Sequence, residues 1–229
     1  MVISPPKVPK PSDPQLVRRS QHSAREAWRM FEIIAEFVTA TERLPAIQPA
    51  VAIFGSARLT PEHPYFRVAE EIARRLSDAG FSVISGGGPG IMEAVNTGAF
   101  EGASPSVGLN IRLPHEQSAN AYQDVSHTFQ HFFARKVMFT KASSAFVMLP
   151  GGFGTLDELF EALTLVQTRK VSPFPVILTG DEGFWDGLVS WLSSSLLRRG
   201  KISPEDLMLL QRAGGPEEVV AMLAASPRG

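Results

Sequence analysis

The sequence predicts an α/β protein with a three-layer, doubly wound (Rossmann-like), mostly parallel sheet, flanking helices and an extra N-terminal helix. Two short apolar runs, residues 81–84 and 145–149, each lead into a glycine-rich turn that opens a helix. Repeated strand, turn and helix units build parallel sheets whose strand ends share one rim. A third run, residues 51–54, is continuously apolar, as a central parallel strand should be.

Composition limits the class of protein. With 229 residues and 44% hydrophobic content, the chain can bury one ordinary core. We expect a flexible tail at 1–12 and a single Rossmann-like domain at 13–229, divided into an N-terminal helix (13–48), a core (50–180) and C-terminal helices (181–229). The net charge of −1 gives no electrostatic case for nucleic acid, and the absence of cysteine excludes disulfides and thiol nucleophiles.

No apolar leader and no apolar run of membrane-spanning length occur in the sequence. We therefore expect a soluble cytoplasmic protein with no membrane partner.

The N-terminal region has a tail and then a helix. Prolines at 5, 6, 9 and 11 predict an extended tail, and Asp13-Pro14 supplies an N-cap and an N1 proline for a helix that reaches about Ala40. One stripe at helical spacing is apolar and is predicted to pack on the domain or on a second subunit. Its members are Ala24, Trp28, Phe31, Ile34 or Ala35, and Val38.

The remaining elements follow in alternation. Periodicity and turn residues predict helices at 62–79, ended by Gly80, and at 91–100. Further along we predict strands at 107–111 and 125–130, a helix at 132–143, a helix at 156–171, a last strand at 175–179, a helix at 184–199, and two short helices opened by Pro204 and Pro216.

The segment AFVMLPGGFGTLDE, residues 145–158, is the predicted active-site element. Its glycines permit a sharp turn, and Thr155 is a plausible N-cap for the following helix. Free N–H groups in the first helical turn, together with the helix dipole, suit a phosphate. In the alternative reading, Thr155 and Glu158 merely form a capping box. We also expect Gly154→Val to impair both binding and stability, because a glycine turn can use backbone angles that valine avoids.

Two common nucleotide-binding motifs are absent from the sequence. Ile91 and Asp157 stand where G-x-G-x-x-G needs its last glycine, and no G-K-[ST] occurs, which disfavours dinucleotide dehydrogenases and P-loop NTPases. Ser56 and Arg58 follow the strand at 51–54, so they should lie on the functional rim. His127 and His131 stand four apart, but no third ligand is evident, and no metal site is predicted.

Three motifs together carry a family resemblance. GGGPGIMEAVNTGAFEG from Gly86, the RK pair at Arg135 and Lys136, and PGGFGTLDE at 150–158 resemble the Lonely Guy family, often labelled "lysine decarboxylase-like". The likeness covers about residues 50–180. It implies an enzyme, a phosphoribohydrolase that hydrolyses the N-glycosidic bond of AMP or cytokinin ribotides to a free base and ribose 5-phosphate.

The resemblance also implies roles for particular residues. Arg135 and Glu158 would be catalytic, because a carboxylate near C1′ can stabilise a ribosyl cation-like state while it orients a water. No metal or organic cofactor is needed, and homodimers with the active site near the subunit boundary are implied. The substrate-binding positions would be Gly55, Ser56, Gly87, Gly88, Met92, Glu116 (against the base), Lys136, Gly151, Gly152, Gly154, Thr155, Asp157 and Thr164.

Two other functions stay open at this point. A lysine decarboxylase would need pyridoxal phosphate on a Schiff-base lysine, and only Lys136 and Lys141 lie near the predicted site. A non-catalytic nucleotide-binding module would keep both glycine turns but would not need Glu158 together with Arg135.

Overall fold

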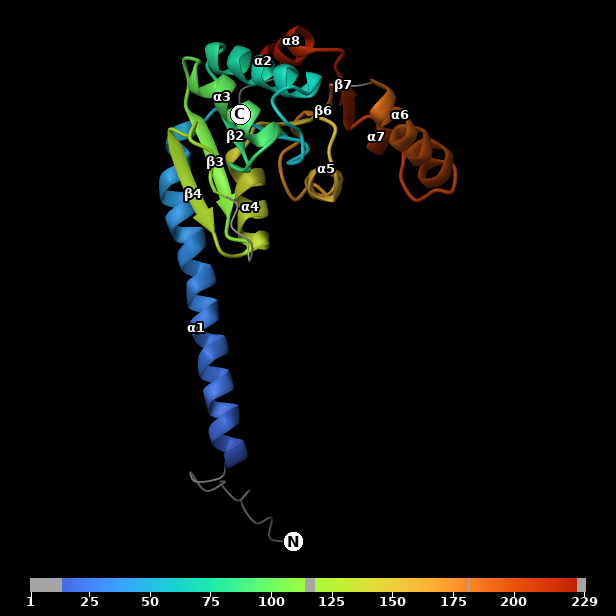
Figure 1. The fold of residues 1–229 in the computed structure, drawn as a ribbon. Coiled ribbons are helices and arrows are strands. Elements are labelled where there is room, and N and C mark those ends of the chain that lie inside the picture. Colours follow the sequence, from blue (N-terminus) through green and yellow to red (C-terminus); the bar gives the residue numbers. More distant parts are fainter. Residues whose placement is uncertain (1–13, 114–117, 181, 226–229) are drawn as a thin grey trace.

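The computed structural model describes residues 14–113, 118–180 and 182–225 (Figure 1). In this part of the chain seven parallel strands form one sheet in the order β4-β3-β2-β1-β5-β6-β7. The strands are β1 (Ala50–Phe54), β2 (Ser82–Ser85), β3 (Ser106–Ile111), β4 (Val125–Phe129), β5 (Ala145–Met148), β6 (Val176–Leu178) and β7 (Leu210–Arg212).

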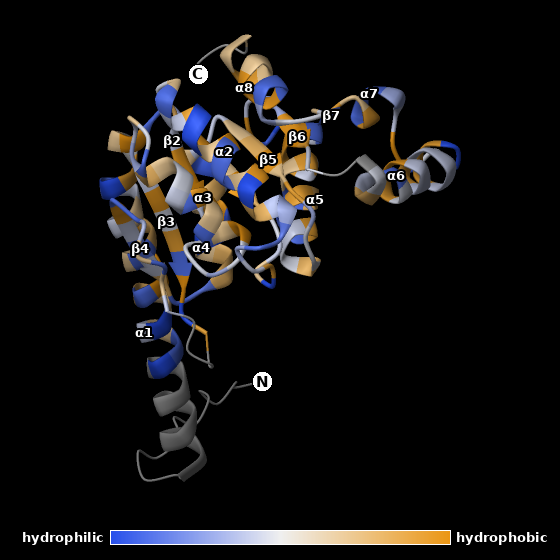
Figure 2. Ribbon diagram, turned by 45° about the horizontal axis from the view of Figure 1, so that its top comes forward, coloured by the Kyte–Doolittle hydropathy of each residue, from blue (hydrophilic) through white to orange (hydrophobic). Residues whose placement is uncertain are grey.

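Helices cover both faces of the sheet. Alternate residues of β1 point to opposite sides, so that Ala52 and Phe54 join one apolar cluster while Val51 and Ile53 join the other. The first cluster includes side chains of α1 (Pro14–Arg43), α4 (Phe132–Ala142), α5 (Phe153–Gln167) and α6 (Glu182–Trp191), and the second includes side chains of α2 (Pro64–Asp78), α3 (Ile91–Phe100) and α8 (Pro216–Ala225). Strands β3 and β5 are accordingly among the hydrophobic parts of the ribbon (Figure 2). The predicted three-layer, doubly wound architecture is confirmed.

Three local predictions were wrong. The sheet does not end at residues 175–179, because β7 pairs in parallel with β6; its three residues, Leu-Gln-Arg, are too short and too polar to show a strand pattern. The helix predicted at 184–199 is α6 followed by a π-helical turn, η2 (Leu192–Leu197). Helix α5 begins at Phe153, three residues before the predicted start. The remaining short helices are η1 (Leu44–Ile47) and α7 (Pro204–Leu207), and the tail predicted at 1–12 lies outside the described residues.

The strand order creates a crevice beside β1. From β1 the chain winds outward through β2, β3 and β4, then crosses back through α4 so that β5 lies on the other side of β1. The connections after β1 and β5 therefore diverge at the carboxyl edge of the sheet, which is where open α/β sheets bind ligands. Both predicted glycine turns, after β2 and after β5, open onto this edge.

Helix α1 projects well beyond the body of the domain (Figure 1). Near its C-terminal end Ala40 is buried, and the Glu36 carboxylate accepts a hydrogen bond from the Gln130 backbone N–H at 2.7 Å and lies 3.3 Å from His131 Nδ1. From Trp28 to Val38 the predicted stripe is solvent-exposed, with Trp28 at 71% and Phe31 at 63%, so packing of this part of the stripe on its own domain was a wrong expectation. No helix in the described segments is at once long and apolar enough to cross a membrane.

Gly90, which opens α3, is one position where the backbone requires glycine. Its φ is +70°, and a Cβ built on it would lie 2.5 Å from the Ser56 carbonyl oxygen. Gly154 is different: it has ordinary helical geometry, and a Cβ there would meet nothing within 4 Å. The stability loss expected for Gly154→Val from backbone strain was therefore wrong.

We expect Gly90→Ala to lower the free energy of unfolding by about 2–4 kcal/mol, because it combines a disfavoured backbone angle with a clash against main chain. Chemical denaturation followed by circular dichroism measures this. The matched control is Gly187→Ala in α6, where the new methyl group meets nothing within 4 Å and should be neutral or slightly stabilising. Equal stability of the two variants would contradict the argument.

Candidate active site

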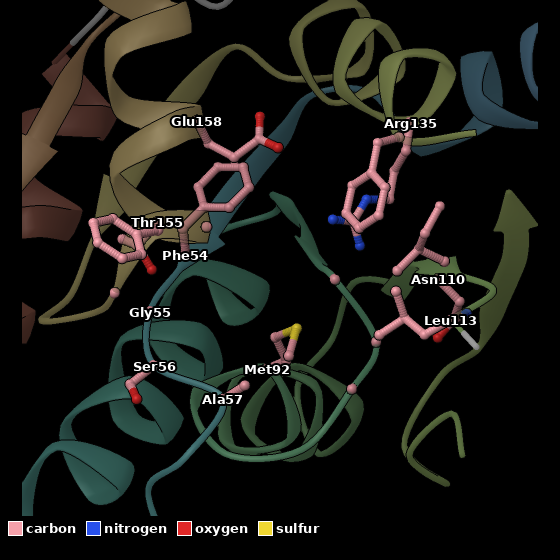
Figure 3. Close-up of a pocket in the computed structure, with 18 of the residues that line it drawn as sticks. Phe54, Gly55, Ser56, Ala57, Met92, Asn110, Leu113, Arg135, Thr155 and Glu158 are labelled. Carbon is pink, nitrogen blue, oxygen red and sulfur yellow. The ribbon is translucent and has the colours of Figure 1, made fainter. Parts of the chain in front are cut away.

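A cleft of about 660 Å³ lies at the carboxyl edge of the sheet beside β1 (Figure 3). This volume is in the range of sites that bind small molecules. Its walls come from the loop after β1, the glycine turn after β2, the end of β3, one side of α4 and the first turns of α5. The lining residues are Phe54, Gly55, Ser56, Ala57, Arg58, Gly86, Gly87, Gly88, Met92, Asn110, Ile111, Leu113, Ser118, Ala119, Phe132, Arg135, Phe139, Gly152, Phe153, Gly154, Thr155, Leu156 and Glu158.

The first turn of α5 forms one wall. Its N-cap is Gly152, no side chain caps it among the described residues, and no acid lies in its first turn. Gly152 and Gly154 leave open space beside the backbone, and Phe153 is 92% exposed. The first-turn N–H groups and the positive end of the helix dipole are thus available to an anion.

Thr155 was wrongly predicted as the N-cap, because it lies inside the helix as its third residue and is buried. A Cβ on Gly151 would overlap the Thr155 side chain, so Thr155 packs under the glycine turn. Glu158 lies one turn further along and cannot serve as the N3 partner of a capping box that starts at Gly152. The capping-box reading is therefore wrong.

Ser56 joins the two glycine turns through its backbone. Its N–H donates to the Pro150 carbonyl at 3.1 Å, and its carbonyl accepts from the Ile91 N–H at 3.0 Å. The loop after β1 therefore holds the start of α3 and the turn before α5 in fixed relation.

Half-buried amide side chains support the turn after β2. The Asn120 backbone N–H and the Gln123 side chain both donate to the Gly87 carbonyl, at 2.8 and 3.0 Å, and the Asn120 side chain donates to the Gly88 carbonyl at 3.1 Å. The same Asn120 amide donates to Asn96 on α3. Sequence analysis missed these supports; the one available signal was a polar Asn96 within an apolar helix.

Glu158 and Arg135 both extend toward the cleft, from α5 and α4 respectively (Figure 3). Glu158 is only 5% exposed, and burial raises its pKa to about 7, although the positive charges of Lys136 and Arg135 act to lower it. Burial lowers the pKa of Arg135, while Glu158 and Asp157 act to raise it. The Arg135 guanidinium lies over the rings of Phe132 and Phe139, at 5.2 and 5.7 Å, and its buried Nε–H has no partner among the described residues.

Lys136 lies outside the cleft lining and connects α4 to α5. Its ammonium contacts Asp157 Oδ1 at 2.8 Å and Glu161 Oε2 at 2.7 Å. Burial alone would lower the pKa of Lys136, but the hydrogen bonds to Asp157 and Glu161 outweigh it, and the pKa is raised. Lys136 therefore holds together the two helices that carry Arg135 and Glu158.

Most of the residues predicted for the site meet in the cleft. Ten line it: Arg135, Glu158, Gly55, Ser56, Gly87, Gly88, Met92, Gly152, Gly154 and Thr155. Gly151, Lys136, Asp157 and Thr164 do not line it, and the Thr164 hydroxyl donates to the Phe160 carbonyl in α5. Glu116 lies outside the described residues. Asn110, Leu113, Phe132 and Phe153 line the cleft without having been predicted.

The two histidines do not share a helix face. His127 lies in β4, whereas His131 is the N-cap of α4 and contacts Glu36. Among the described residues no group of three or more His, Asp or Glu side chains is arranged to hold a metal ion.

If the ionised form of Glu158 supports catalysis in this cleft, we expect Lys136→Met to shift the rise of activity with pH toward higher pH. Lys136 lowers the pKa of Glu158, so its removal raises that pKa further, and a larger share of Glu158 is protonated near neutrality. Initial rates against pH test this: activity should fall several-fold at about pH 6 and recover above about pH 9. The control is Lys141→Met, on an exposed position of the same helix. A uniform loss at every pH would mean that Lys136 serves only packing.

Comparison with known proteins identifies relatives. Residues 92–223 match the family described as "Possible lysine decarboxylase". A cytokinin riboside 5′-monophosphate phosphoribohydrolase of Mycobacterium tuberculosis is 32% identical over 159 residues, which are 67% of this chain and 82% of that protein. The LOG1 protein of Arabidopsis thaliana, with the same activity in its name, is 28% identical over 76% of this chain and 81% of its own length. A bifunctional cytokinin biosynthesis protein of Fusarium pseudograminearum is 28% identical, and 40% of its length is covered.

Among solved structures, the structural-genomics target TM1055 superposes with a TM-score of 0.61 at 25% identity. The match covers 78% of this chain and the whole of that one. The fold found here is therefore shared with an experimentally determined structure.

Proposed function

The chain belongs to the possible lysine decarboxylase family, the family of the Lonely Guy proteins, and on this premise we propose that it is a nucleoside 5′-monophosphate phosphoribohydrolase. It would hydrolyse the N-glycosidic bond of AMP or cytokinin ribotides to the free base and ribose 5-phosphate. The observation that carries the proposal is a buried carboxylate, Glu158, and a guanidinium, Arg135, in one cleft with an uncapped helix N-terminus.

The spacing in α5 fits this reaction. The 5′-phosphate binds at the first turn, and Glu158 lies one turn later, which is about the span from the phosphate to C1′ across the ribose. When the C1′–N bond breaks, the electron pair leaves with the base and positive charge develops on the sugar. The Glu158 carboxylate stabilises this charge and orients a water whose oxygen bonds to C1′ and whose proton passes to the carboxylate. That proton then passes through solvent to the departed base, which gives the neutral free base and returns Glu158 to its ionised form.

Arg135 acts at the leaving base. The Arg135 side chain lines the cleft, so the terminal N–H groups of its guanidinium can hydrogen-bond the base as it gains electron density. The rings of Phe132 and Phe139 keep the guanidinium in place.

Pyridoxal phosphate chemistry does not fit these residues, despite the family's descriptive label. A Schiff-base lysine must present a neutral amine to the cofactor, whereas the Lys136 ammonium is held by two carboxylates and its pKa is raised. Lys141 is an exposed residue of the last turn of α4 and does not line the cleft. We therefore derive no step through this cofactor.

The direct test is an assay of the purified protein against a panel of nucleoside 5′-monophosphates, including AMP and cytokinin ribotides. Released base is measured by chromatography and ribose 5-phosphate by an enzyme-coupled assay. We expect equimolar release of both products, and little turnover of the corresponding nucleosides, because phosphate binding aligns C1′ with Glu158. Tight nucleotide binding with no product from any substrate would favour a non-catalytic binding module.

We further propose a homodimer whose interface lies near the active site. Apolar side chains are exposed on three elements: Trp28, Phe31, Ile34 and Val38 on α1, Phe132, Phe133 and Val137 on α4, and Phe153 and Phe160 on α5. Exposed apolar surface of this extent is typical of subunit interfaces, and a two-fold dimer is the commonest closed assembly.

Light scattering should therefore give twice the 24.9 kDa mass of one chain at micromolar concentration. Phe133→Asp should shift the mass toward the monomer and reduce activity together. The matched control is Phe184→Asp on α6, since Phe184 is 45% and Phe133 49% exposed. A fully active wild-type monomer would contradict the proposal.

A further inference from the structure

The charges that line the cleft are not balanced. Among the described lining residues three side chains are ionisable, namely Arg58, Arg135 and Glu158. Arg135 and Glu158 influence each other's pKa and so act as a pair of opposite charges. Arg58 is exposed to solvent and forms no ion pair with any residue that the structure describes. Counted over the described residues alone, the cleft thus carries one guanidinium without a counter-charge.

The backbone beneath Arg58 is fixed against the start of α5. Ser56 donates its N–H to the Pro150 carbonyl, in the turn that opens α5, and the Arg58 N–H donates to Ser56 Oγ at 3.2 Å. Arg58 therefore belongs to the part of the rim that adjoins the uncapped helix N-terminus. A cation next to the positive end of a helix dipole is unfavourable unless an anion binds between them.

A phosphate monoester suits this combination. It carries a charge of about −1.5 to −2 at neutral pH and three acceptor oxygens. The first-turn N–H groups of α5 can engage some of these oxygens, and a guanidinium can engage two others through its fork of donors. Lys136, another cation predicted for the substrate site, is already neutralised by Asp157 and Glu161.

We propose that Arg58 binds the 5′-phosphate of the substrate and makes the enzyme selective for nucleotides over nucleosides. This inference rests on the proposed function and adds a residue to it. Arg135 cannot replace Arg58 in this role, because it comes from α4 on the other side of the cleft from Ser56 and lies over two aromatic rings (Figure 3). The two arginines then serve opposite ends of one substrate, Arg58 the phosphate and Arg135 the base.

The test measures binding of ribose 5-phosphate and of adenosine by calorimetry, separately from turnover. Arg58→Ala should weaken ribose 5-phosphate binding roughly 10- to 100-fold and leave adenosine binding unchanged. Arg58→Lys, which keeps the charge but loses the bidentate fork, should fall between the wild type and Arg58→Ala. The matched control is Arg112→Ala, an exposed arginine just after β3 that does not line the cleft. Circular dichroism should show that all three variants are folded, because both arginines are exposed.

The outcomes separate this inference from the proposed function. Unchanged ribose 5-phosphate affinity in Arg58→Ala, or an equal loss in Arg112→Ala, would refute the role of Arg58 even if the wild type hydrolyses nucleotides. An equal loss for adenosine and ribose 5-phosphate would show that Arg58 only shapes the cleft, and would refute phosphate selectivity. Selective loss of ribose 5-phosphate in a protein that releases no base would support Arg58 and overturn the hydrolase.

Discussion

Glu158→Gln is expected to lower turnover at least about 100-fold while nucleotide binding and the fold are kept. The substitution removes the charge but hardly changes the volume of the side chain. The amide can neither stabilise a ribosyl cation nor accept a proton from water, so the loss should appear in kcat and not in KM. Glu101→Gln, an exposed acid just after α3 and outside the cleft lining, is the control and should retain most activity.

The stability of the same variant separates a catalytic role from a structural one. Burial raises the pKa of Glu158 from 4.5 in the unfolded chain to about 7 in the folded protein, so stability falls as the pH rises from about 4.5 to about 7, by about 3 kcal/mol in all. That cost is absent below about pH 4.5. Glu158→Gln should consequently be at least as stable as the wild type at about pH 8. If Glu158→Gln unfolds at a much lower temperature than the wild type while its turnover stays normal, Glu158 has a structural and not a catalytic role.

Arg135→Ala is expected to abolish most activity, with a loss of roughly 100-fold. It removes the donors assigned to the leaving base, and it also removes a positive charge that lowers the pKa of Glu158. The residual activity of the variant should therefore rise at a higher pH than that of the wild type, which a pH series of initial rates can detect. Arg135→Lys, with the charge but not the planar fork, should recover only part of the rate. Wild-type turnover in Arg135→Ala would mean that the arginine merely covers Phe132 and Phe139.

The fold was predictable because its central strands are continuous apolar runs. Buried parallel strands such as β1 and β5 leave a signal that needs no knowledge of their neighbours. β7 leaves none, since its three residues are a strand only because β6 offers an open edge. The start of α5 was misplaced for a related reason: Thr155 has the chemistry of an N-cap, but the fold buries it under Gly151.

The site was predictable where its chemistry is local in sequence. Glycine turns and the Arg135–Lys136 pair can be read as short motifs, and the turns do open onto the cleft. Contacts between distant segments cannot be read in this way. The hydrogen bond from Asn120 to Gly88 and the ion pair between Lys136 and Glu161 join residues that only the folded chain brings together.

Ser56 gives the cleft a property that matters for the thermodynamics of recognition. Its N–H is hydrogen-bonded to the turn after β5, and its carbonyl is hydrogen-bonded to the start of α3. Neither the turn nor the start of α3 can therefore move outward without breaking a main-chain hydrogen bond. The donors proposed to bind the phosphate are preorganised: their conformational entropy is lost when the protein folds and not when the ligand arrives. A small, rigid product such as ribose 5-phosphate should therefore bind with little change in amide hydrogen exchange at Ser56 and Ile91. The affinity for ribose 5-phosphate would then reflect electrostatics and hydrogen bonding, with no entropic cost for ordering the loop that contains Ser56.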